Sequence, residues 1–183
     1  LYLSEELIKL GHKVEVITSD LNRNGNLNVL EENYKKIKIK RIKTWFRIGD
    51  FGSFFPGVFK LVKNSNSDII HFNSYRHPHN LDCFFTKKIT VLTPHWPDYK
   101  GLRKKYIELL IKIYDKTLGK IILNKFNKII AVAEPEVNWL NKKFNINKEK
   151  IIVIPNAIPK TQLKVRDDTK FKNKYRLKEN KLI

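Results

Sequence analysis

Apolar residues occur along the chain in short runs, separated by longer stretches in which apolar and charged residues mix. Five runs have the length and composition of buried parallel strands, at residues 13–18, 69–72, 89–92, 129–132 and 151–154. A sixth segment, residues 37–43, alternates between isoleucine and basic residues at period two. This alternation predicts an exposed or edge strand.

Helical patterns lie between these runs. They cover residues 1–10, 58–62, 102–126 and 136–144, the third with an interruption near Gly119. Gly11 follows the first helix as a stop signal, and Pro135 precedes the last at a first-turn position. Residues 21–28 read as a polar loop. Strands alternating with helices predict βαβ units, and hence an α/β fold with a Rossmann-like, doubly wound parallel sheet covered on both faces.

The chain is strongly basic. Of its 183 residues, 37 are lysine or arginine and 18 are aspartate or glutamate, which gives a formal charge of +19. Such a charge attracts polyanions such as nucleic acid, anionic lipid or nucleotide phosphates. A lysine-, isoleucine- and asparagine-rich composition also arises in AT-rich genomes without selection for binding. No helix-turn-helix, zinc-finger or RNA-recognition signature accompanies the charge, so nucleic acid is not the favoured partner.

Cysteine content and hydropathy bear on the compartment. Cys83 is the single cysteine, which excludes an internal disulfide and offers no metal cluster. No stretch approaches the roughly 18 apolar residues of a membrane-spanning helix, and no signal-peptide pattern opens the chain. We therefore expect a cytoplasmic protein, with any membrane contact peripheral at the cytoplasmic face.

In open parallel sheets, ligands bind beyond the carboxyl ends of the strands. Four places in this chain qualify by that rule. They are residues 19–20, 73–77, 93–96 and 133–136, and all carry polar side chains directly after an apolar run.

Five motifs occur in an order and spacing that resemble the N-terminal domain of family 4 glycosyltransferases, which have the GT-B architecture. They are LSEELIKLGHKVEVITSD (3–20), DIIHFNS (68–74), VLTPHW (91–96), KIIAVAEPEVNWL (128–140) and KIIVIPNAI (150–158). The third resembles the family's Thr-x-His element, and the fourth its Ser-x-x-Glu type strand and helix. The chain departs from the family pattern at Ala133, where serine is common, at Ala157, where glycine is usual, and at Pro159, near the usual aspartate.

The resemblance implies a domain organisation. Residues 1–159 are expected to form the acceptor-side, N-terminal half of a GT-B fold without its first strand. Residues 160–183 are expected to be an interdomain connection that leads to an absent C-terminal donor-binding domain. Because that domain supplies most donor contacts in the family, the present chain is expected to be inactive alone.

The same resemblance implies an activity. Family members transfer a sugar from a nucleotide-sugar donor to an acceptor hydroxyl, usually a hexose and usually with retention, without a bound metal or other cofactor. The expected acceptor is a glycan, of the cell envelope or linked to lipid. Another GT-B enzyme, such as a sugar-nucleotide epimerase, shares the architecture, and the PHW and PNAI segments favour family 4.

Candidate site residues follow from the motifs. His95 matches the Thr-x-His position and is the predicted catalytic residue, because an imidazole can donate to or accept from an acceptor hydroxyl at neutral pH. The alternative is a histidine that only holds its loop. The predicted substrate-binding residues are His71, Asn73, Arg76, His77, Glu134 and Asn156.

Each of these has a structural alternative. His71 lies inside a strand pattern and reads equally as a core histidine. Arg76 and His77, with His79, suit an acceptor phosphate or form a solvated polar loop. Glu134 opens a helix whose N-terminus favours carboxylates, and Asn156 suits a backbone contact before the crossover.

One segment is both basic and amphipathic. Residues 100–128, from Lys100 to Lys128, carry lysines and arginines interleaved with leucine, isoleucine and tyrosine. This pattern is typical of a helix that lies on an anionic membrane, and also of an ordinary packed helix with a lysine-rich outer face. The alternative function is accordingly a non-catalytic basic module that binds anionic membrane or nucleic acid while keeping the half-fold.

Overall fold

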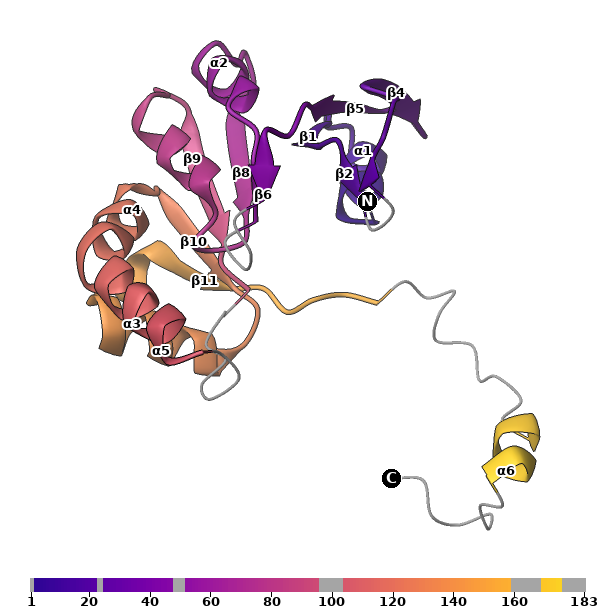
Figure 1. Ribbon diagram of the computed structural model, residues 1–183. Coiled ribbons are helices and arrows are strands. Elements are labelled where there is room, and N and C mark those ends of the chain that lie inside the picture. Colours follow the sequence, from indigo (N-terminus) through magenta and orange to yellow (C-terminus); the bar gives the residue numbers. More distant parts are fainter. Residues whose placement is uncertain (1, 23–24, 48–51, 96–103, 159–168, 176–183) are drawn as a thin grey trace.

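A four-stranded, fully parallel sheet forms the centre of the protein (Figure 1). The computed structural model describes residues 2–22, 25–47, 52–95, 104–158 and 169–175. The central sheet has the order β8 (Ile69–Asn73), β9 (Ile89–Thr93), β10 (Lys128–Ala131) and β11 (Ile151–Val153). These four strands were all predicted from their apolar runs, and they confirm the Rossmann-like α/β class.

A second sheet of three strands has β5 (Ile37–Ile42) in its middle. β5 pairs in parallel with β1 (Glu15–Ser19) on one side and antiparallel with β4 (Glu31–Tyr34) on the other. The prediction that residues 37–43 form an exposed or edge strand was therefore wrong. Ile37 and Ile39 are buried, whereas Lys38 between them is exposed. The segment Glu31–Tyr34 gave no strand signal because its side chains are mostly polar.

Two short hairpins complete the strands. One joins β2 (Leu21–Asn22) to β3 (Gly25–Asn26), and the other joins β6 (Phe46–Arg47) to β7 (Ser53–Phe54). The predicted polar loop at residues 21–28 thus contains a hairpin. Gly25 has a φ of 116°, which a residue with a side chain rarely adopts.

The predicted helices are present. They are α1 (Tyr2–Lys9), α2 (Gly57–Lys63), α3 (Lys105–Tyr114), α4 (Lys120–Lys125) and α5 (Glu134–Phe144). The predicted interruption near Gly119 is confirmed as a π-helical segment, η3 (Asp115–Gly119), between α3 and α4. Two 3₁₀ helices that the pattern did not predict are η2 (Pro78–Phe84) and η4 (Lys148–Lys150).

The predicted connecting segment, residues 160–183, is described only over α6 (Thr169–Tyr175). The rest of that segment, and part of the basic segment at residues 100–103, lie outside the described residues.

The main core lies between the central sheet and its helices. Phe72, Leu92 and Ile129 from three adjacent strands pack with apolar side chains of α2, α4 and α5, including Leu123 and Leu140. Burial of such side chains is the main free-energy gain of folding, about 25 cal/mol per Å² of apolar surface. No helix among the described residues is both long enough and apolar enough to cross a membrane.

The two larger sheets share this core, since Ile17 of β1 and Ile42 of β5 pack against it. Among the described residues, β1 and β8 each pair with another strand along one side only. Each is thus the end strand of its sheet.

Candidate functional site

The carboxyl ends of the four parallel strands lie along one edge of the central sheet. Asn73 ends β8, His95 follows β9, Glu134 follows β10 and Asn156 follows β11, and all four side chains are exposed. We call these four residues the carboxyl-edge site. Because neighbouring strands lie about 4.8 Å apart, the site extends over about 14 Å.

The loop that carries His95 is tied to the neighbouring loop by main-chain hydrogen bonds. Ser74 N donates to Thr93 O at 2.9 Å, and Tyr75 N donates to Pro94 O at 3.0 Å. Pro94 is fully buried, whereas His95 directly after it is exposed. The imidazole of His95 therefore projects from a fixed base.

Three of the six described non-glycine residues with positive φ lie in these two loops, and the other three are Lys35, Lys36 and Asn145. Ser74, Arg76 and His95 have φ values of 71°, 65° and 54°, in the left-handed region that non-glycine residues seldom occupy. Such residues persist where the surrounding structure holds them, and they cluster at functional sites. Their position at the ligand edge of the sheet supports a functional role for this edge.

His71 lies one strand away from the His95 loop and beneath it. Its Nε2 forms a hydrogen bond of 2.7 Å with Thr93 Oγ1, so it joins β8 to the end of β9. Burial, and secondarily the charge of His95, lowers the pKa of His71. His71 is thus neutral near pH 7, and its imidazole lies within electrostatic reach of His95.

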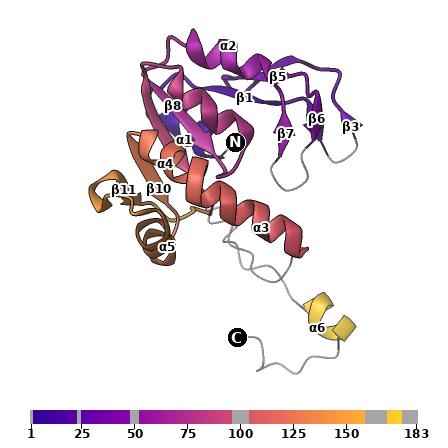
Figure 2. The same cartoon turned by 60° about the vertical axis from the view of Figure 1, so that its left-hand side comes forward.

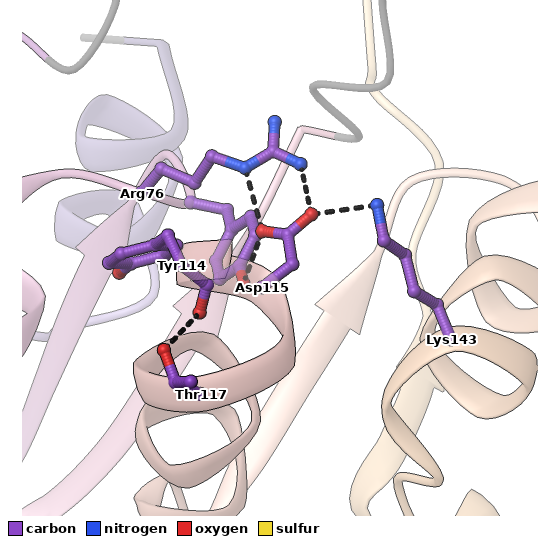
Figure 3. Close-up of polar contacts among 6 residues, drawn as sticks. Arg76, Tyr114, Asp115, Thr117 and Lys143 are labelled. Carbon is purple, nitrogen blue, oxygen red and sulfur yellow. Dashed lines mark hydrogen bonds and ion pairs between the residues drawn. The ribbon is translucent and has the colours of Figure 1, made fainter. Parts of the chain in front are cut away.

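Arg76 is buried in an ion pair (Figure 3). Its Nε donates to Asp115 Oδ1 at 2.9 Å and its Nη2 donates to Asp115 Oδ2 at 2.6 Å. Lys143 Nζ reaches the same Oδ2 at 2.7 Å, and the Tyr75 hydroxyl donates to Oδ1 at 3.1 Å. The guanidinium that was predicted to contact an acceptor phosphate therefore joins the β8 loop to η3 and α5.

The pKa of Asp115 reflects these contacts. Burial alone would raise it, but the hydrogen bonds and charges of Arg76 and Lys143 outweigh burial and lower it. The carboxylate is therefore ionised at neutral pH. It is the anion on which the network of Arg76, Lys143 and Tyr75 depends.

Sequence reasoning missed Asp115, Lys143 and Tyr75 as members of this network. The sequence did contain a signal for a buried carboxylate at this position. Asp115 is an acidic residue in a basic, apolar helix, and it lies four residues before Gly119. A Cβ at position 119 would overlap the Tyr75 hydroxyl, so glycine is needed there for close packing. π-Helical segments of this kind often occur at functional positions.

His77 and His79 are packed together. Their ring centroids lie 3.8 Å apart, and both rings lie against Phe55. Burial lowers the pKa of His77 to about 4, and burial with the charge of His77 lowers that of His79 to about 3. The alternative of a solvated loop is wrong, because both rings are largely buried and neutral.

The two acidic residues at the start of α5 differ in their surroundings. Glu134 is exposed at the carboxyl edge, whereas Glu136 is fully buried and its Oε2 accepts a 2.6 Å hydrogen bond from Val132 N. Glu136 thus fixes the turn between β10 and α5, and Glu134 faces solvent. Within the described part of the chain, no three His, Cys, Asp or Glu side chains are grouped so that they could hold a metal ion.

Comparison with known proteins agrees with the motifs. The family Glycosyltransferase Family 4 matches residues 1–162. Over 95 residues the chain is 26% identical to an uncharacterised glycosyltransferase of Methanocaldococcus jannaschii, an alignment that covers 51% of this chain and 24% of that relative. The chain thus spans about a quarter of the length of the relative it matches. The match over residues 1–162 shows that the chain belongs to glycosyltransferase family 4.

Proposed function

We propose that this chain is the acceptor-side part of an enzyme that transfers a sugar from a nucleotide-sugar donor to an acceptor hydroxyl. The acceptor hydroxyl binds at the carboxyl-edge site, formed by Asn73, His95, Glu134 and Asn156. Residues 1–159 form the acceptor-side domain, and residues 160–183 connect it to a donor-binding domain. The observation that carries the proposal is the exposed, strained His95 at the ligand edge of the parallel sheet.

His95 has the chemistry to orient an acceptor. A neutral imidazole can accept the proton of the attacking hydroxyl or hold its oxygen by donating a hydrogen bond. Its loop is fixed by the main-chain bonds from Ser74 and Tyr75, so the ring needs little reorganisation when the acceptor binds.

Supporting residues keep this arrangement in place. The His71–Thr93 hydrogen bond holds the end of β9, and the Arg76–Asp115 pair holds the loop after β8. In this proposal Arg76 and His71 are positioning residues. Asn73, Glu134 and Asn156 supply hydrogen-bonding groups for sugar hydroxyls along the edge, and His77 supports the loop from inside.

The chemistry that we assign needs no metal. The bond between the anomeric carbon and the phosphate oxygen of the donor breaks, and the nucleoside diphosphate leaves with that electron pair. The anomeric carbon forms a new bond to the acceptor oxygen, whose proton passes to the His95 imidazole. The transferred sugar is a hexose, and its anomeric configuration is retained. Anomeric proton coupling constants of the product, measured by NMR, report the configuration directly.

The test is sugar transfer by the complete natural protein, assayed with a panel of nucleotide sugars and with soluble and lipid-linked acceptors. We expect His95→Ala to lower turnover by about a hundredfold or more, the usual loss on removal of a general acid or base. The matched control is His12→Ala, since His12 is also exposed and lies after α1, outside the site.

Two results would contradict the proposal. One is equal turnover by His95→Ala and His12→Ala, which would remove His95 from the site. The other is no transfer with any donor, together with retained binding to anionic surfaces, which would favour the non-catalytic basic module.

A further inference from the structure

Helices α3 and α4, with η3 between them, expose an unusual amount of apolar surface. Six large apolar side chains along them are at least half exposed, namely Tyr106, Leu109, Leu110, Ile113, Leu118 and Ile121. The opposite side of the same helices is anchored in the protein by Ile111, Ile122 and Leu123, which are buried. The outer face therefore presents apolar as well as basic side chains.

Lysines flank this apolar face. Exposed lysines occur at positions 104, 105, 112, 116 and 120. Lys105 lies four residues before Leu109 and Lys112 three residues after it, so all three share one side of the helix. Apolar side chains with bordering lysines are the composition of helices that lie in the headgroup region of anionic bilayers.

The position of α3 relates this face to the carboxyl-edge site. α3 is the crossover helix between β9 and β10, so its first turns lie toward the carboxyl ends of the strands. Figure 2 shows α3 extending outward from the sheet. A surface that contacts α3 would therefore lie next to the edge that carries His95.

We propose that the exposed apolar face of α3, η3 and α4 docks on an anionic lipid bilayer. Leu109, Leu110 and Ile113 enter the headgroup region, while Lys105 and Lys112 contact lipid phosphates. Charge favours an anionic bilayer over a second copy of the chain at this face. A second copy carries the same charge of +19 and is repelled, whereas an anionic bilayer attracts the chain. The proposal does not depend on sugar transfer.

The test is co-sedimentation of the whole chain with vesicles, without donor or acceptor. One set of vesicles contains phosphatidylcholine alone. The other contains phosphatidylcholine with about 30% phosphatidylglycerol, an anionic lipid. We expect binding to the anionic vesicles only. The double variant Leu109→Ser, Leu110→Ser should weaken that binding at least tenfold, and Lys105→Gln or Lys112→Gln by about fivefold each.

Matched controls lie elsewhere on the chain. Leu3 on α1 is 59% exposed, the same fraction as Leu109, so Leu3→Ser tests whether any exposed leucine matters. Lys142 on α5 is an exposed lysine outside the face, so Lys142→Gln tests for general charge. Neither control should change vesicle binding by more than about twofold in this proposal.

Several outcomes would overturn the proposal. Equal binding to neutral and anionic vesicles, or equal losses for Leu3→Ser and the Leu109, Leu110 double variant, would show that this face is not specific. A dimer in analytical ultracentrifugation that the double variant dissociates, without vesicle binding, would make the face an interface between copies. Urea unfolding of each variant separates these results from loss of folding, and the lysine variants test the proposal if the leucine variants unfold.

Discussion

Arg76 and Asp115 lie 39 residues apart in the chain and form a buried ion pair through two hydrogen bonds of 2.9 and 2.6 Å. Arg76 comes from the strained loop after β8, and Asp115 opens the π-helical segment η3. The pair therefore fixes the ligand edge of the sheet to the helix that follows the next strand.

Removal of the carboxylate should be costly. Asp115→Asn removes the buried carboxylate that pairs with the Arg76 guanidinium, and we expect it to lower the free energy of unfolding by about 3–5 kcal/mol. Urea denaturation measures this loss. As a control, Glu6→Gln breaks the exposed ion pair with Lys9 and should change stability by less than about 1 kcal/mol. Similar effects of the two substitutions would show that burial adds nothing to the Arg76–Asp115 pair.

Gly119 and Tyr75 should be energetically coupled. Gly119→Ala would normally favour a helix, yet the new methyl group would overlap the Tyr75 hydroxyl, so we expect a loss of about 1–3 kcal/mol. Tyr75→Phe removes that hydroxyl and makes room. In a double-mutant cycle, Gly119→Ala should cost at least about 1 kcal/mol less in the Tyr75→Phe background. Strict additivity of the two substitutions would rule out the contact as the cause.

The Thr93 hydroxyl should matter for both stability and activity. Thr93→Val keeps the shape of the side chain but leaves His71 Nε2 without its partner, which should cost about 1–3 kcal/mol in urea denaturation. The loop that carries His95 should also be held less firmly, so we expect at least a severalfold loss of turnover in the complete protein. Thr18→Val, at an exposed position of β1, is the control. A fully active Thr93→Val protein would separate the His71–Thr93 bond from catalysis.

Acid should destabilise the protein through the histidine pair. The pKa values of about 4 for His77 and about 3 for His79 lie below the ordinary value of 6.5, so the unfolded chain binds more protons between pH 6.5 and 4. Stability is therefore present above pH 6.5 and falls as the pH drops through this range, by up to about 1.4 kcal/mol per pH unit for each histidine.

Asp82 affects stability in the opposite direction. Burial raises its pKa to about 6, so the folded protein binds the proton at a higher pH than the unfolded chain does. The contribution of Asp82 to the free energy of unfolding therefore grows as the pH falls from 6 toward 4. The measurement is the slope of unfolding free energy against pH, compared between the natural chain and His79→Asn. We expect a shallower slope in the variant. An unaltered slope in His79→Asn would contradict the assignment.

The central sheet was predictable because buried parallel strands have a local signal. In the runs that became β8, β9, β10 and β11, most residues are apolar over a short length. The residues of β5 were predicted correctly, but its position in the sheet was not, since β5 is the middle strand and not an edge strand. Its partner β4 is formed by Glu31–Tyr34, whose pairing depends on the neighbouring strand and not on its own side chains.

The candidate site was predictable only in part, for a similar reason. The positions of His95 and Asn73 follow from where strands end, which is a local property. The burial of Arg76 does not, because it requires Asp115 and Lys143 from two other helices. A basic side chain in a polar loop looks the same in sequence whether it faces a phosphate or a buried carboxylate.

Among the residues that the structure describes, β8 is an end strand of its sheet, and this has a consequence for handling the protein. Charged side chains on an end strand usually prevent it from pairing with the sheet edge of another molecule. The residues of β8, Ile69–Asn73, contain no lysine, arginine or acidic side chain. At low ionic strength the charge of +19 keeps molecules apart. In 1 M salt that repulsion is screened within about 3 Å, so concentrated samples in high salt should be the first to form intermolecular β-structure.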